Sequence, residues 1–297
     1  MWWATSTNNN WGYSMDEILE KTKILLDNDE KYTIGDVCKM WPMTNENLKE
    51  VYKLFDVKDK SVLTVTSSGD HIFESMVAGA KVVDSFDVNY LTEYYYYLKK
   101  AMIKNYKLKL YLDIIESLSY GIISTNSYDS VRDELNGEGQ LFWDQIIDWY
   151  RRDNDFCIEN LYNTTINIKQ FNLVNYLCKS NFKLLKKMVD SYNIGFIHSD
   201  LFSLDDKLDK TYDFIYLSNI YGYVDKVSYF GLNKVKEYAK CKLYPYLNDG
   251  GTIVYGYLYG YSLDHFNSIY GLKDKDEGYY PIDGTYGRKD CLFTLKK

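Results

Sequence analysis

The sequence predicts an α/β protein whose core is a doubly wound, mostly parallel β-sheet. Short apolar runs alternate with helical patterns along much of the chain, as repeated βαβ units require. Several of these runs end in Asp, Asn, Ser or Gly, which are the residues expected where parallel strands meet a ligand. With 297 residues the chain is long enough to bury one large core. We expect an N-terminal helical arm over residues 1–57 and the sheet within residues 58–297.

The expected arm begins with a helix signal. Ser14 and Glu17 have the spacing of a capping box, in which each side chain satisfies a free backbone N–H group at the start of a helix. Thr33 and Thr44 are in position to cap two more short helices. The apolar positions of the first helix are Ile18, Leu19, Leu25 and Leu26. We expect these helices to form a lid or a packing arm.

The first βαβ unit has the clearest pattern. A continuous apolar run at 62–66 is followed by a turn of small residues and by a helical pattern at 71–78. A second strand is predicted over 81–86 and ends in Asp87. Asp87 lies 18 residues after Gly69, close to the separation of about 20 residues between a cofactor-binding turn and the acidic residue that holds a ribose.

The rest of the sheet is predicted from further apolar runs. Strands are expected at 194–198, 213–217 and 251–257, with a last, antiparallel strand at 291–295. Helical patterns cover 91–104, 180–192 and 228–244. Residues 105–192 form an insertion of about 90 residues, which is mostly helical by pattern and too long for a loop. We expect the insertion to cap the substrate.

Composition argues against several classes of function. The net charge of −7 disfavours nucleic acid as a partner, because binding to a phosphate backbone needs clustered positive charge. The scattered cysteines include no Cys-x-x-Cys pair, so we expect buried thiols in a cytoplasmic protein and neither a metal site nor disulfides. They are Cys38, Cys157, Cys178, Cys241 and Cys291. We expect no signal peptide and no membrane-spanning helix. The 32 tyrosines are interpreted as coding bias.

Four predicted strand ends carry polar residues that suit a nucleoside ligand. The turn at 67–70 offers backbone N–H groups, and Asp70 could receive a ligand ammonium group. Asp87 could accept both hydroxyl groups of a ribose, and Asp200 could accept from an adenine amino group. Residues 218–219 could line the reaction centre. Each of these positions taken alone could instead be an ordinary strand end or helix cap.

The turn at 67–70 favours an adenosyl amino acid over a dinucleotide. It holds one glycine, whereas the turn that accepts a pyrophosphate has three in the pattern G-x-G-x-x-G. An adenosyl amino acid needs a ribose acceptor, an adenine contact, and partners for its ammonium and carboxylate groups. The four strand ends supply residues of these kinds.

Three segments resemble a known family. They are 62–70 (VLTVTSSGD), 82–89 (VVDSFDVN) and 212–220 (YDFIYLSNI), and they are similar to the class I S-adenosylmethionine-dependent transferases, which have a Rossmann-like fold. More narrowly, they resemble the branch related to the betaine-lipid enzymes, which transfer a 3-amino-3-carboxypropyl group from S-adenosylmethionine to diacylglycerol. The resemblance covers residues 41–104 and 194–259.

The resemblance implies S-adenosylmethionine as the cofactor and suggests its contacts. The methionyl end would be surrounded by Thr66, Ser67, Ser68, Gly69 and Asp70. The ribose would be held by Asp87 and Asn89, and adenine would be flanked by Asp200 and Leu201. The sulfonium and the catalytic step would be bordered by Ser218, Asn219 and Tyr221. Because the turn departs from the glycine-rich loop of ordinary methyltransferases, methyl and 3-amino-3-carboxypropyl transfer both stay open, to a small-molecule or lipid acceptor.

Other candidate residues have structural alternatives. His71 and His198 could act as a general base, although capping or packing is the simpler interpretation. The tyrosines at 94–97 are expected to divide between core and surface, since successive helical positions point around the helix. The substrate pocket could be walled by one or two of Tyr221, Tyr223, Tyr255, Tyr257 and Tyr259. A noncatalytic nucleoside-binding or scaffolding protein with the same fold is the alternative to an enzyme.

Overall fold

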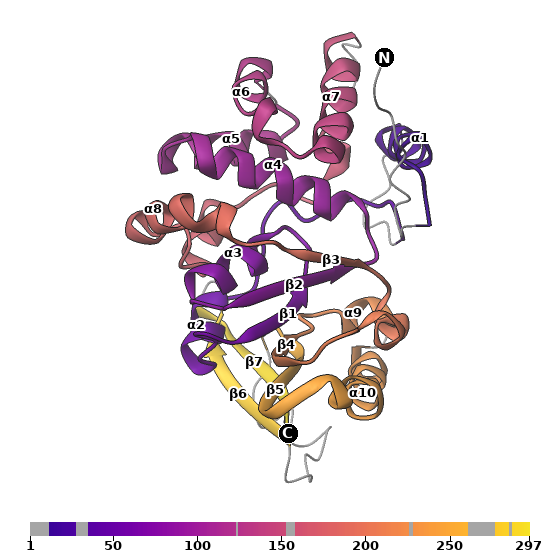
Figure 1. Cartoon of the computed structure of the whole chain (residues 1–297), viewed down its shortest axis with the longest axis vertical. Coiled ribbons are helices and arrows are strands. Elements are labelled where there is room, and N and C mark those ends of the chain that lie inside the picture. The colour runs from indigo at the N-terminus through magenta and orange to yellow at the C-terminus, as the bar shows by residue number, and fades with distance from the viewer. Residues whose placement is uncertain are drawn as a thin grey trace.

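The computed structural model of the protein contains a seven-stranded sheet in the part of the chain that it describes (Figure 1). The described residues are 12–27, 35–122, 124–152, 158–225, 228–260, 277–284 and 287–297. The strands lie in the order β3-β2-β1-β4-β5-β7-β6. Neighbours from β3 to β5 are parallel, whereas β7 is antiparallel to both β5 and β6. The predicted doubly wound, mostly parallel sheet is therefore confirmed.

The strands follow the predicted apolar runs. Their bounds are β1 Ser61–Val65, β2 Val82–Asp87, β3 Gly195–His198, β4 Tyr212–Tyr216, β5 Leu247–Leu258, β6 Glu277–Asp283 and β7 Lys289–Lys296. The sequence pattern did not predict β6, which contains Pro281. Proline cannot donate to a β-ladder and is tolerated on edge strands, and β6 forms one edge of the sheet.

The described helices include both predicted and additional elements. They are α1 Met15–Leu26, α2 Leu48–Leu54, α3 Asp70–Val77, α4 Leu91–Asn105, α5 Leu108–Ser119, α6 Thr125–Asp129, α7 Gly137–Arg152, α8 Lys179–Met188, α9 Tyr221–Val224 and α10 Ser228–Tyr238. Short 3₁₀ turns and one π turn connect several of them. Among the described residues, no helix combines the length and apolar character that crossing a bilayer requires.

Alternate residues of the central strands enter two separate cores. Val62 of β1 and Phe214 of β4 belong to the core shared with α3 and α4. Leu63 and Ile215, their neighbours along the chain, belong to the core on the other face, which includes Leu232 of α10. Side chains of a strand point alternately to its two faces. Both faces of the sheet are therefore buried under helices.

Most of helix α4 is buried and none of its four tyrosines is exposed, so the expected division of these tyrosines between core and surface is wrong. Tyr94, Tyr95 and Tyr96 are at most 1% exposed, and Tyr97 is partly buried. Tyr96 stacks on Phe73 of α3 with 5.1 Å between ring centroids. On the side of α4 turned away from the sheet, α5 and α7 of the insertion pack against it (Figure 1). The insertion covers the face that would otherwise meet water.

The N-terminal arm begins with the predicted helix. In α1 the Ser14 hydroxyl accepts the Glu17 N–H at 3.3 Å, and the Glu17 carboxylate accepts the Ser14 N–H at 2.7 Å, so the capping box is confirmed. Helix α2 is capped by Asn47 and not by Thr44. The Thr44 hydroxyl accepts instead from a backbone N–H two residues later. Thr33 lies outside the described residues.

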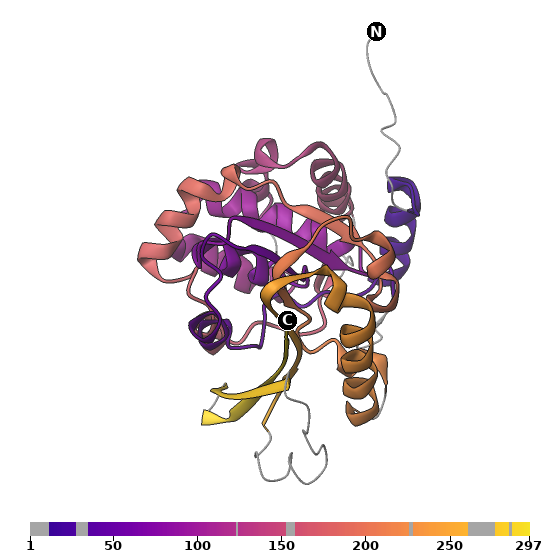
Figure 2. The same ribbon diagram turned by 60° about the horizontal axis from the view of Figure 1, so that its bottom comes forward.

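The arm is joined to the insertion. The Met40 N–H donates to the Leu161 carbonyl at 2.7 Å, and the Asn163 N–H donates to the Met40 carbonyl at 2.8 Å, which forms a short parallel bridge. Helix α1 also packs against α7, beside which it lies in Figures 1 and 2. The arm and the insertion thus hold each other in place, and apolar side chains of both enter the core that contains α3 and α4.

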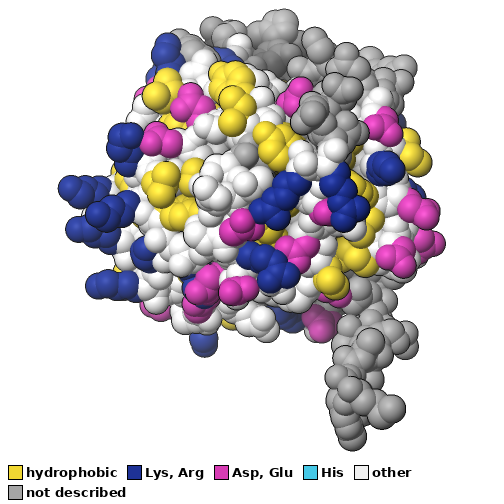
Figure 3. Space-filling view, turned by 90° about the horizontal axis from the view of Figure 1, so that it is seen from above, with side chains coloured by type: hydrophobic (Ala, Val, Ile, Leu, Met, Phe, Trp, Pro, Cys, Tyr) yellow, Lys and Arg dark blue, Asp and Glu magenta, His cyan; other side chains and the backbone are white. Residues whose placement is uncertain are grey.

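The outer face of the insertion carries side chains of mixed type (Figure 3). Arg151 pairs with Asp129 at 2.8 Å, and Lys109 pairs with Asp113 at 2.9 Å. Charges of both signs are interspersed with hydrophobic side chains across this view. Exposed pairs of this kind contribute little to stability, so the insertion is held mainly by its buried face.

A buried ion pair ties four segments together. Asp70, at the start of α3, pairs with Lys99 of α4, and both side chains are at most 1% exposed. The Asp70 carboxylate also accepts from the Tyr176 hydroxyl at 2.6 Å, the Thr44 N–H at 2.8 Å and the Ser68 hydroxyl at 2.7 Å. Burial alone would raise the pKa of Asp70, but Lys99 and the hydrogen bonds outweigh burial and hold the pKa below its ordinary value.

Replacement of Lys99 should destabilise the whole fold. We expect Lys99→Met to lower the free energy of unfolding by about 3–5 kcal/mol, because it leaves the Asp70 charge buried without its partner. The control Lys53→Met breaks the exposed pair with Glu50 and should cost about 0–1 kcal/mol. Urea denaturation followed by circular dichroism measures both values. Equally small losses in the two variants would contradict a stabilising role for the buried pair.

Candidate functional site

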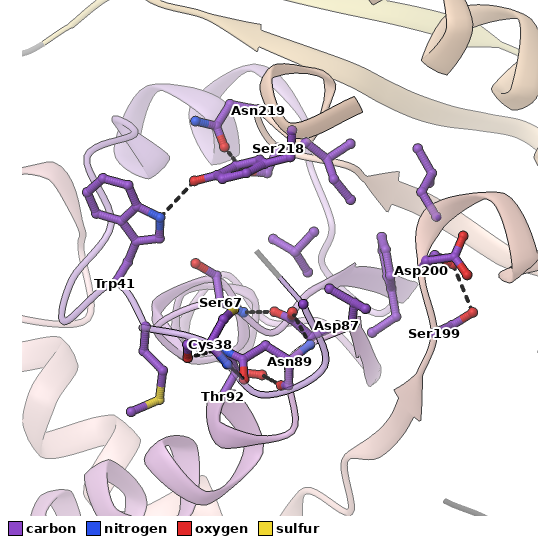
Figure 4. A pocket seen from close by; sticks show the side chains of 18 of the residues that line it. Cys38, Trp41, Ser67, Asp87, Asn89, Thr92, Ser199, Asp200, Ser218 and Asn219 are labelled. Carbon is purple, nitrogen blue, oxygen red and sulfur yellow. Dashed lines mark hydrogen bonds between the residues drawn. The ribbon is translucent and has the colours of Figure 1, made fainter. Parts of the chain in front are cut away.

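A pocket of about 430 Å³ opens beyond the C-terminal ends of β1, β2 and β4 (Figure 4). It is lined by Val65 from β1, Asp87 from β2 and Ser218 just after β4. Strands β1 and β4 are neighbours in the sheet, and the chain continues from them toward opposite edges. Open parallel sheets bind ligands at such a switch point, because the loops diverge there and leave a crevice.

Asp87 presents a fixed carboxylate to the pocket. Its Oδ2 atom accepts the Ser67 N–H at 2.8 Å, and its Oδ1 atom accepts the Asn89 N–H at 3.0 Å. Burial raises the pKa of Asp87, although these N–H groups favour the ionised form. The two backbone bonds orient the carboxylate and leave lone pairs for the hydroxyl groups of a ligand.

The turn after β1 contributes one of its predicted residues to the pocket lining. Ser67 lines the pocket, whereas Thr66, Ser68, Gly69 and Asp70 do not. The side chains of Thr66, Ser68 and Asp70 are buried. Ser67 has a positive φ of 45° and Gly69 one of 80°, and such values are costly for residues other than glycine. The turn therefore offers the pocket a small side chain on a strained backbone, and the Asp70 charge stays in the core.

The segment after β4 lines the opposite side of the pocket (Figure 4). Ser218, Asn219 and Tyr223 line it, whereas Tyr221 does not. Ser218 has a positive φ of 59°. The Tyr221 hydroxyl donates to the Tyr257 carbonyl at 3.2 Å, and its ring is buried in the core on the α10 side of the sheet. Of the tyrosines near β4 and β5, Tyr223 is thus the one that walls this pocket.

The segment after β3 lies at one end of the pocket. Asp200 and Leu201 line it. The Oδ1 atom of Asp200 accepts the Phe202 N–H at 2.8 Å, which caps a short 3₁₀ turn and leaves the other carboxylate oxygen available. His198 does not line this pocket. Its ring stacks on Tyr90 with 3.5 Å between centroids, and burial lowers its pKa.

The arm closes another side of the pocket. Residues 38–41 line it, and the Trp41 indole N–H donates to the Tyr223 hydroxyl at 2.8 Å. The Asn89 side chain holds this segment, because its amide donates to the Cys38 carbonyl at 2.8 Å and accepts the Cys38 N–H at 3.3 Å. The sequence suggested a lid here but not its residues, since residues 38–41 form no recognisable motif.

A buried carboxylate lies directly behind Ser218. The Oε1 atom of Glu46 accepts the Ser218 hydroxyl at 2.6 Å, and its Oε2 atom accepts the Tyr216 hydroxyl at 2.6 Å. The Nε2 atom of His71 lies 3.2 Å from the same Oε2 atom. Glu46 is 2% exposed, and neither it nor His71 lines the pocket. Within the described ranges, no group of three His, Cys, Asp or Glu side chains could hold a metal ion.

The order of the strands, with β7 reversed against both neighbours, identifies the fold. The fold is that of the class I methyltransferases. No protein-family model matches the chain, and no curated protein matches it.

Solved structures with similar folds have low sequence identity. A ribosomal protein L11 methylase from Lactobacillus delbrueckii subsp. bulgaricus is 12% identical, with 84% of this chain and 77% of that chain covered and a TM-score of 0.37. A methyltransferase from Pyrococcus furiosus is 11% identical, with 84% and 81% covered and a TM-score of 0.37. SMU.1697c from Streptococcus mutans, in complex with S-adenosylhomocysteine (SAH), is 9% identical, with 86% and 100% covered and a TM-score of 0.37. Similarity at this level assigns no ligand, substrate or activity to this chain.

The cysteines give a chemical test of how the arm is held. Cys38 and Cys291 are buried, whereas Cys178 and Cys241 are exposed, so the expectation of buried thiols is wrong for the latter two. Cys178 is the residue that precedes α8, and Cys241 lies in the π turn that follows α10. Cys157 lies outside the described residues. Burial, with the nearby Asp87 charge, raises the pKa of Cys38 to about 12.

Alkylation should follow this division. At mildly alkaline pH we expect iodoacetamide to modify Cys38 more than about tenfold more slowly than Cys178, because the thiolate is the reactive form. The variant Asn89→Ala should increase the rate of alkylation at Cys38, since it releases residues 38–41. The rate of alkylation at Cys291 should stay low in this variant. Timed labelling with mass spectrometry of the peptides measures each rate. Rapid modification of Cys38 in the unsubstituted protein would contradict the closed position of the arm.

Proposed function

We propose that the protein binds S-adenosylmethionine in the pocket beyond β1, β2 and β4 and transfers a group from it to an acceptor. The observation that carries the proposal is the Asp87 carboxylate, which two backbone N–H groups hold toward the pocket. A ribose has two adjacent hydroxyl groups, and one carboxylate can accept from both. Asp87 would therefore hold the ribose, with Asn89 keeping the arm in place beside it.

The end of the pocket near Asp200 suits adenine. Apolar side chains cover much of the lining and would contact the flat faces of the base. They include Val65, Phe86, Val88, Leu201 and Ile220. The carboxylate oxygen of Asp200 that does not cap the 3₁₀ turn would accept from the adenine amino group. The methionyl end would then extend toward Ser67, Ser218 and Asn219.

The reaction would depend on positioning more than on a strong acid or base. S-adenosylmethionine supplies a sulfonium whose attached carbons are electrophilic, so the protein must chiefly orient it and exclude water. Ser218 and Asn219 would border that centre, and the hydrogen-bonded Trp41 and Tyr223 would wall the acceptor side. Tyr221 would act through packing, because its hydroxyl is engaged by a backbone carbonyl. Methyl transfer and 3-amino-3-carboxypropyl transfer differ in which carbon faces the acceptor, a small molecule or a lipid.

Binding and product analysis test the proposal together. We expect calorimetry to detect both S-adenosylmethionine and SAH, and no binding of either at millimolar concentration would refute the proposal. With pools of small amines, alcohols and diacylglycerol as acceptors, release of SAH would identify methyl transfer. Release of methylthioadenosine would identify 3-amino-3-carboxypropyl transfer. Binding without release of either product would favour the noncatalytic nucleoside-binding alternative.

Substitution of Asp87 should weaken cofactor binding selectively. We expect Asp87→Asn to raise the Kd for SAH by about 10- to 100-fold, since it removes the charge that accepts from the ribose. The control Asp213→Asn changes a carboxylate at the start of β4, at the opposite end of the sheet, where it accepts from Ser61. That variant should bind SAH as the unsubstituted protein does. Unchanged affinity in Asp87→Asn would remove Asp87 from the site.

A further inference from the structure

Asp70, which the sequence suggests as the partner of a ligand ammonium group, is engaged by other residues in the core. Asp70 is fully buried, does not line the pocket, and has its charge compensated by Lys99. Its two oxygens also accept from Tyr176, Thr44 and Ser68. A cationic group in the pocket would need another anionic partner.

Glu46 has the charge that Asp70 cannot provide. In the described part of the chain no Lys or Arg forms an ion pair with Glu46, and its neighbours are the Ser218 and Tyr216 hydroxyls and the His71 ring. The Nδ1 atom of His71 is buried and has no hydrogen-bond partner among the described residues. The Glu46 carboxylate is thus held by two hydroxyl groups and the His71 ring, with no Lys or Arg partner in the described part of the chain.

Ser218 connects this charge to the pocket. Its hydroxyl proton is directed to Glu46 at 2.6 Å, so toward the pocket the oxygen can only accept. The positive φ of 59° and a hydrogen bond from the Tyr257 N–H to the Ser218 carbonyl at 3.0 Å fix the backbone there. Strained residues of this kind are found at ligand-binding positions. Asp200, the exposed carboxylate of the lining, lies at another end of the pocket (Figure 4).

We propose that Glu46, acting through Ser218, makes the pocket selective for a ligand that carries an ammonium group. This inference rests on the proposed function and identifies the ammonium as that of the amino-acid part of the cofactor. The ammonium donates to Ser218 Oγ, whose own proton is donated to Glu46, so the carboxylate polarises the hydroxyl and stabilises the positive charge. Glu46 is a positioning residue, because it acts on the ligand through Ser218.

Three ligands separate recognition of the ammonium from general binding. They are SAH, its deamino analogue in which hydrogen replaces the amino group, and methylthioadenosine, which lacks the whole amino-acid part. We expect Glu46→Gln to raise the Kd for SAH by about tenfold and to change the Kd of the other two ligands by less than about twofold. Calorimetry at neutral pH measures all three constants. Unchanged methylthioadenosine binding shows that the rest of the pocket is intact.

Two further variants serve as controls. Glu93→Gln changes another buried carboxylate, which accepts from the Tyr97 hydroxyl at 2.6 Å and does not line this pocket, and it should leave all three constants unchanged. Ser218→Ala should weaken the binding of SAH more than the binding of the deamino analogue. The double variant Ser218→Ala with Glu46→Gln should weaken SAH binding by less than the sum of the two separate losses in binding free energy, since both substitutions break the same connection between Glu46 and the ligand.

The outcomes distinguish the inference from the proposed function. If the unsubstituted protein binds none of the three ligands, the proposed function fails. If the unsubstituted protein binds SAH but Glu46→Gln weakens the binding of all three ligands equally, or of none of them, Glu46 does not recognise the ammonium group. If Glu46→Gln does not fold, Ser218→Ala decides, and an equal loss for SAH and its deamino analogue overturns the inference.

Discussion

The buried contact between Asp70 and Lys99 sets the positions of the parts that build the pocket. Through the same carboxylate, α3 is tied to α4, to Tyr176 in the insertion and to Thr44 in the arm. Glu46 follows Thr44 by two residues, so the contact that anchors the arm also places Glu46 behind Ser218. An uncompensated charge in this core would be costly. The ion pair therefore couples the packing of the helical layer to the geometry of the candidate site.

The pocket combines a rigid side with a side built from distant segments. Strand ends β1, β2 and β4 supply Ser67, Asp87 and Ser218 on the sheet. In the described part of the chain, non-glycine residues with positive φ are Asp59, Ser67 and Ser218, and two of these three line the pocket. Such strain persists only where the surroundings hold the backbone firmly. The buried sheet supplies that support, while residues 38–41 of the arm cover the cavity from outside.

Local patterns explain why much of the fold could be predicted and why some of the candidate site could not. Apolar runs indicated β1 to β5 and β7, but the pattern of β6 is interrupted by Pro281, which only its edge position makes acceptable. Asp87 could be named because its separation from the first turn is a local spacing. The link from Glu46 to Ser218 spans 172 positions and follows no spacing rule.

The sequence by itself determined most of the strands and their alternation with helices along the chain, the polar strand ends and the presence of an aspartate after the second strand. These properties depend on side-chain periodicity and turn chemistry within a few residues. Tertiary structure decided which of the polar residues face the pocket: Asp87, Asp200 and Ser218 do, whereas Asp70 is paired with Lys99 in the core. The physical reason is that burial and charge compensation depend on partners that the packing of distant segments brings together. The sequence near each residue does not identify those partners.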